Sequence, residues 1–210
     1  MTGRFLIKGI PILLRRRYKR LRSLIRISNA GEIARRYFVI NAFDGALTIL
    51  GIIVGTLVSG HLDPAFVISA GLGASFAMGV SGVVGAFMAE AAERARALKE
   101  LEGHMFRSLK GTVLDQASRT ATIWIALIDG ISPVVAAVIP LIPMVAALKH
   151  AVPIDIAIIS SVGLDLITLF VLGIFLGKVS ERNVWKSGLV MVSAGITIAL
   201  GLWFLSKLFS

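Results

Sequence analysis

Five long apolar stretches follow one another along the chain, separated by short stretches that are rich in charge. Each is long enough to cross the hydrocarbon core of a bilayer as a helix, which takes about 20 apolar residues. We therefore predict an all-α integral membrane protein with five transmembrane helices, near residues 37–60, 65–89, 121–148, 153–177 and 184–208. Three prolines interrupt the third stretch, so we expect its helix to bend: Pro133, Pro140 and Pro143.

The second apolar stretch predicts a helix that is longer than a bilayer is thick. It has no proline between Ala65 and Glu102, and residues 89–102 are mostly strong helix formers. A continuous helix over these residues would be about 57 Å long, whereas the hydrocarbon core measures ~30 Å. We therefore expect the carboxyl end of this helix to extend into the cytoplasm.

The N-terminal segment, residues 1–36, is strongly basic. It contains eleven lysines and arginines but a single acid, and apolar residues recur among them at helical spacing: Leu14, Tyr18, Leu21 and Ile25. This pattern is typical of an amphipathic helix that lies on an anionic leaflet. An arginine-rich organellar targeting peptide is the alternative interpretation.

Basic residues are distributed unequally between the two sides of the predicted membrane domain. Eleven lie in the N-terminal segment, six after the second span and three after the fourth, whereas the other side has only Lys149 and Lys207. By the positive-inside rule, this places the N-terminus in the cytoplasm and the C-terminus outside. We predict a basic segment, residues 1–36, followed by one transmembrane domain, residues 37–210, in the cell membrane.

Composition narrows the possible functions. The chain is 56% hydrophobic and has a net charge of +10. Its basic residues lie mainly before and between the apolar stretches, so the partner we expect is the lipid bilayer and not nucleic acid. The absence of cysteine excludes disulfides and thiolate metal sites. No predicted span contains histidine, and no nucleophile–base pattern appears, so we expect neither an enzyme nor a bound cofactor.

One carboxylate lies inside the first apolar stretch. Asp44 is the only charge in residues 37–60, and a buried charge in a membrane marks an ion or proton path. On a helix it shares one face with small or polar residues: Thr48, Gly51, Gly55 and Ser59. The alternative is a helix-packing face on which Asp44 bonds to a neighbouring helix. Asp129 and Asp165 are the other intramembrane acids, and we rank both below Asp44.

One face of the second helix changes character along its length. Small residues and Met78 occupy it within the span, and Glu93 and Glu100 occupy it beyond. Met78 can supply a thioether ligand or simply fill a gap in the core, and Glu100 can pair with Arg96. The small-residue stripes of the first and second helices predict the contacts of a homodimer: residues 51, 55 and 59, and residues 71, 75 and 79.

Several short motifs occur in a fixed order from residue 31 to residue 210. Gly31-Glu32-Ile33-Ala34-Arg35 precedes Asp44-Gly45, Pro140-Leu141-Ile142-Pro143 follows, and the last are Leu169–Gly173 and Trp185–Leu189. This series resembles the vacuolar iron transporter and related iron/manganese transporter family. The resemblance implies an all-helical dimer with a metal path along the subunit interface, lined by the first two helices.

The sequence departs from that family's pattern in two places. The family usually has Ser-Met-x-x-Gly-Glu in its second helix, but here the methionine and glutamate positions hold Gly82 and Ala86. Plant-type members carry a helical cytosolic metal-binding domain after the second span, and residues 90–119 are too short to hold all of it.

We therefore predict a transporter that moves a divalent metal ion, Fe²⁺ or Mn²⁺, out of the cytoplasm by proton antiport through a dimer interface. Its partners are the metal ions, protons and a second copy of the chain. The predicted metal-contacting residues are Asp44, Met78, Glu32, Glu93 and Glu100. The alternative function is a non-transporting membrane scaffold whose acids only pair helices.

Overall fold

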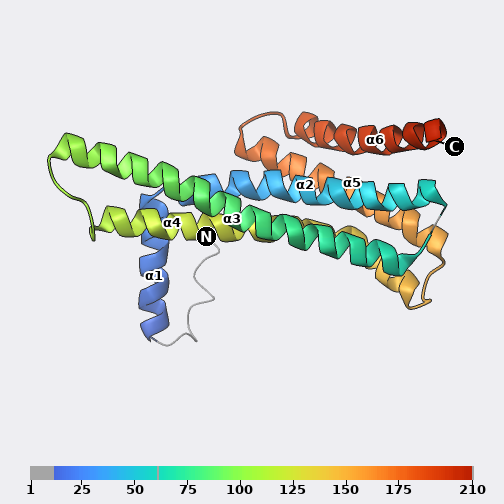
Figure 1. Ribbon diagram of the computed structural model, residues 1–210, viewed down its shortest axis with the longest axis horizontal. Coiled ribbons are helices and arrows are strands. Elements are labelled where there is room, and N and C mark those ends of the chain that lie inside the picture. Colours follow the sequence, from blue (N-terminus) through green and yellow to red (C-terminus); the bar gives the residue numbers. More distant parts are fainter. Residues whose placement is uncertain (1–11, 61, 210) are drawn as a thin grey trace. The chain divides into compact units, whose positions relative to one another are not determined.

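The computed structural model describes residues 12–60 and 62–209, which form six α-helices and no strands (Figure 1). Five of these described helices, α2 to α6, are long and apolar enough to cross a membrane. This confirms the all-α fold class and the five predicted spans. The helices are α1 (Ile12–Ile27), α2 (Ala30–Ser59), α3 (Pro64–Met105), α4 (Val113–Leu148), α5 (Ile154–Val179) and α6 (Val184–Phe209).

Helix α3 is continuous over 42 residues, which corresponds to about 63 Å. Its first residue is Pro64, which a first helical turn accommodates because no hydrogen bond is lost there. The predicted continuity through residue 102 is confirmed, and the helix also includes Gly103. It ends before Phe106, whose φ of 50° turns the chain towards α4.

Helix α4 covers the expected third span as a single helix, which continues through all three of its prolines. A proline has no N–H group, so the carbonyl four residues earlier loses its usual helical donor. The carbonyls affected are those of Asp129, Ala136 and Ile139. Membrane helices tolerate such gaps where neighbouring helices pack against them, and α2 packs closely here: a Cβ added to Gly45 would lie 2.6 Å from Pro133 Cα.

The chain divides into two compact units, and the larger contains residues 36–84 and 128–210. Its core joins α2, α4, α5 and the first half of α3, and its largest fully buried side chains include Ile49, Leu50, Ile53, Met144 and Leu169. Helices α5 and α6 form a hairpin (Figure 1). Gly173 permits this approach, since a Cβ there would lie 2.6 Å from Gly188 Cα.

The smaller unit contains, in the described part of the chain, residues 12–35 and 85–127. Here α1 lies beside the start of α4, and Arg20 donates to Gln116 Oε1 over 2.5 Å. The predicted N-terminal helix is thus present as α1, with Tyr18 exposed on it. Residues 1–11 of the predicted basic segment and the side chain of Leu14 lie outside the description.

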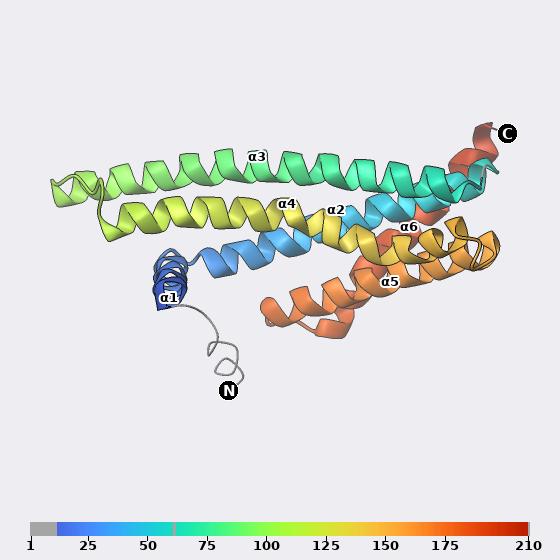
Figure 2. The same cartoon turned by 90° about the horizontal axis from the view of Figure 1, so that it is seen from below.

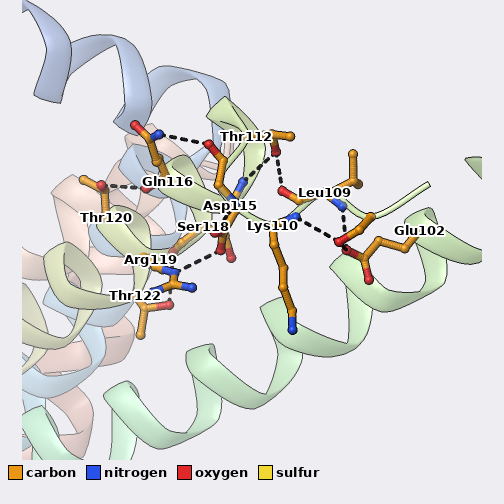
Figure 3. A network of polar contacts seen from close by, with 12 residues as sticks. Glu102, Leu109, Lys110, Thr112, Asp115, Gln116, Ser118, Arg119, Thr120 and Thr122 are labelled. Carbon is orange, nitrogen blue, oxygen red and sulfur yellow. Dashed lines mark hydrogen bonds and ion pairs between the residues drawn. The ribbon is translucent and has the colours of Figure 1, made fainter.

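Hydrogen bonds from side chains order the turn between the antiparallel helices α3 and α4 (Figures 2 and 3). Glu102 accepts from the Leu109 N–H group over 2.6 Å. Asp115 accepts from the Gly111 N–H group and from Arg119 Nε. These two bonds lower the pKa of Asp115, which precedes the apolar part of α4. Glu102 and Asp115 therefore both order the turn.

Candidate metal site

Asp44 lies on α2, and its side chain is exposed within the single chain. One turn later, Thr48 Oγ1 lies 2.8 Å from the carbonyl oxygen of Asp44 and 3.6 Å from Met78 Sδ, so its hydroxyl can donate to either. Met78 itself is half-buried on α3. The structure thus places Met78 beside the polar face of α2 that begins at Asp44.

A second carboxylate, that of Asp129 on α4, contacts α2 about one turn before Asp44. Asp129 is almost fully buried, with 4% of its surface exposed. Its Oδ1 accepts a hydrogen bond from Asn41 Nδ2 on α2. Its Oδ2 faces α3, where a Cβ added to Gly82 would lie 3.0 Å away. Asp129 therefore sits where α2, α3 and α4 meet.

Sequence reasoning ranked Asp129 below Asp44 and did not consider Asn41. One signal for Asn41 was present, because it precedes Asp44 by three residues and so lies on a neighbouring part of the same helical face. A signal for Asp129 is Pro133, four residues later, which deprives the Asp129 carbonyl of its helical donor. That carbonyl oxygen also faces Gly82, at 3.4 Å from an added Cβ.

The chemistry of this group suits a hard or borderline divalent cation. It offers carboxylate, amide, hydroxyl and carbonyl oxygens together with one thioether, and oxygen donors suit Mn²⁺ and Fe²⁺ better than softer ions. Within the described residues, however, no cluster of three or more His, Cys, Asp or Glu side chains could hold a metal ion.

The three predicted glutamates belong to the smaller unit, whereas Asp44 belongs to the larger one. Glu93 and Glu100 are exposed and line one groove on α3, together with Arg96 and the alanines at 89, 92 and 97. Glu32 is exposed in the first turn of α2 and does not line this groove. Among the described residues, Glu100 and Arg96 do not form the expected ion pair. The ion pair found on the described part of α3 joins Arg94 Nε to Glu90 Oε2 at 3.0 Å.

The two small-residue stripes have different surroundings. On α3, a Cβ added to Gly71 would lie 2.9 Å from Ile49 Cδ1, and one added to Gly79 would lie 2.7 Å from the Gly130 carbonyl oxygen. This stripe packs against the same chain, which corrects its assignment to a dimer interface. On α2, a Cβ added to Gly51 or Gly55 would meet no heavy atom of the described structure within 4 Å.

Comparison with known proteins gives two findings. The sequence model of the VIT family matches residues 95–206, which include all of α4 and α5 and most of α6. An uncharacterized protein of Methanocaldococcus jannaschii is 34% identical over 192 residues, covering 90% of this chain and 96% of that protein. This second similarity extends over more of the chain than the family match does.

Proposed function

This chain belongs to the VIT family of membrane metal ion transporters, and on that premise we propose that it moves Fe²⁺ or Mn²⁺ out of the cytoplasm in exchange for protons. The observation that carries the proposal is that α2 meets two other helices on either side of Asp44: Asn41 contacts the Asp129 carboxylate of α4, and Thr48 contacts Met78 Sδ of α3. A scaffold needs no such group, because two carboxylates brought together repel each other. A divalent cation bound between them removes that repulsion.

The position of Gly82 supports a preference for hard ions. The family usually has a methionine at this position. In this chain the Asp129 carboxylate lies next to the place that a side chain of residue 82 would occupy. A carboxylate oxygen thus takes the place of a thioether sulfur. Oxygen ligands favour Mn²⁺ and Fe²⁺, while Met78 retains one softer contact.

The glutamates of the smaller unit have a separate role in this proposal. With the N-terminus in the cytoplasm, as the distribution of basic residues favours, Glu32, Glu93 and Glu100 lie on the cytoplasmic side of the membrane. Their exposed carboxylates attract cations from solution and raise the local concentration of metal ions. In this proposal the glutamates attract the metal ion to the protein, and Asp44 and Asp129 bind it within the membrane.

A second copy of the chain completes the coordination shell. A two-fold axis beside the open face of α2 would bring two Asp44 side chains to one path, and the exposure of Asp44 fits this arrangement. The space beside Gly51 and Gly55 allows another helix to approach closely.

We expect Gly55→Leu to shift the detergent-solubilised protein from dimer to monomer without unfolding it. A Cβ at residue 55 meets no heavy atom of the described structure within 4 Å, so we attribute a loss of the dimer in this variant to a clash with the neighbouring molecule. Mass measurement in detergent by light scattering checks this, with Gly73→Leu, also free of contacts but on α3, as the matched control. A dimer that persists in Gly55→Leu would contradict an interface through this face of α2.

Transport in reconstituted vesicles tests the proposed function directly. Vesicles with a pH indicator inside are supplied with Fe²⁺, Mn²⁺, Co²⁺ or Zn²⁺ in parallel. We expect metal uptake coupled to proton release, fastest with Mn²⁺ or Fe²⁺. Protein that folds and forms dimers, yet moves neither metal ions nor protons, would instead support the scaffold function.

A further inference from the structure

A third intramembrane carboxylate, Asp165 of α5, has an environment unlike that of Asp44 or Asp129. Its side chain is completely buried, as is the hydroxyl-bearing side chain of Ser161 one turn earlier. Within the described structure, neither Asp165 oxygen nor Ser161 Oγ has a hydrogen-bond partner. Buried polar side chains normally have one, so this arrangement needs a physical explanation.

The surroundings of Asp165 are apolar. The buried residues on the same side of α5, Ile158 and Leu169, belong to the two hydrophobic clusters of the larger unit, and Val162 and Leu166 pack against them. Those parts of α2 to α6 that belong to the larger unit carry few charges besides Asp165, and in the described part none of these forms an ion pair or hydrogen bond with Asp165. They are Arg36 and Asp44 of α2, Asp129 of α4, Asp155 and Lys178 of α5 itself, and Lys186 and Lys207 of α6.

An ionised carboxylate is unstable in such a place. It would have neither water, nor a hydrogen-bond donor, nor a cation to replace its hydration, and the helix would be strongly destabilised. A neutral carboxylic acid avoids most of that cost. It also acquires an O–H group. The Ser161 hydroxyl, one helical turn earlier, is not hydrogen-bonded to Asp165 in the structure and can accept this O–H group only after a change of side-chain rotamer.

We infer that Asp165, together with Ser161, is a proton-binding site, and that the proton is bound in the conformation described here. Binding is the simple reaction of the carboxylate with one proton to give the acid, and release is its reverse. The ligand is therefore H⁺ and not a metal ion, since the site offers too few oxygens to replace a metal's hydration shell.

This inference extends the proposed function and rests on it for its role in transport. The metal ion binds at Asp44 and Asp129, and the exchanged proton is carried by Asp165 on a different helix. Release requires a conformation in which water reaches α5, because only hydration stabilises the ionised form. Separate carboxylates for metal and proton would allow each to be bound while the other is released.

Infrared spectroscopy tests proton binding without any transport measurement. At neutral pH we expect the carbonyl band of a protonated carboxyl group in the wild-type protein and its loss in Asp165→Asn. The Asp155→Asn variant is the matched control, because Asp155 is exposed on the same helix. An amide has nearly the shape of the neutral acid, so Asp165→Asn should fold. Identical carbonyl bands in the wild type and Asp165→Asn would overturn the inference.

Transport measurements then test the role of the bound proton. Asp165→Asn should still carry metal ions down a concentration gradient, but its metal-dependent proton movement should fall to the level of empty vesicles. Wild-type proton coupling in this variant would show that another group carries the proton. If the wild type itself moves no metal, the proposed function fails, while the infrared result still decides whether Asp165 binds a proton.

Discussion

The Asp44→Asn variant should be inactive in metal transport, with a loss of more than about 100-fold, yet should fold and form dimers like the wild type. The substitution keeps the size of the side chain but removes the charge that binds the cation. Substitution of a residue that only supports a metal ligand typically lowers metal affinity or activity 10–100-fold, so loss of the ligand itself should lower transport further. Uptake of Mn²⁺ into vesicles and the accompanying pH change provide the measurement.

Substitutions elsewhere should have distinguishable effects in the same assay. Met78→Leu keeps the volume but loses the thioether, and should alter the preference among metals more than the rate with Mn²⁺.

Glu93→Gln and Glu100→Gln should raise the metal concentration needed for half-maximal transport, with a smaller loss of maximal rate. Wild-type activity in Asp44→Asn would contradict the central role of this residue and leave Asp129 as the leading candidate.

A single methyl group at residue 79 should strongly destabilise the protein. In Gly79→Ala the new Cβ would lie 2.7 Å from the carbonyl oxygen of Gly130, and neither backbone can move without separating α3 from α4. Overpacking of this kind costs about 1–3 kcal/mol. We expect a lower unfolding temperature in detergent and a larger aggregated fraction on size-exclusion chromatography.

The matched control is Gly73→Ala on the same helix. A Cβ at residue 73 meets no heavy atom of the described structure within 4 Å, and alanine favours a helix over glycine by about 1 kcal/mol. This variant should therefore be at least as stable as the wild type. Equal stability of the two variants would mean that α3 and α4 do not approach each other closely at Gly79.

The helices could be predicted from the sequence because the length and hydropathy of a span are local properties. The continuity of α3 followed in the same way from the absence of proline over residues 65–102. The expected span at residues 121–148 is likewise one helix, α4, but the close packing of α2 that lets it continue through three prolines is not a local property and could not be predicted.

The candidate site was predictable only in part. Asp44 is conspicuous as the one charge of its span, and Met78 as a thioether on a face of small residues. The role of Asp129 could not be predicted without knowing how α2 crosses α4, because its hydrogen-bond partner Asn41 is 88 residues away in the sequence. The glycine stripes had the same limitation, since a row of small residues indicates close packing but does not identify the helix that approaches.

The prolines of α4 have a mechanical consequence. Between residues 129 and 143, three backbone hydrogen bonds that normally resist bending of a helix are absent. Curvature in this segment therefore meets less elastic resistance than in the continuous α3, and we expect α4 to act as a compliant joint. Asp129 stands at the beginning of that joint, so a change in curvature would rotate its carboxylate relative to Asn41 without breaking any helix.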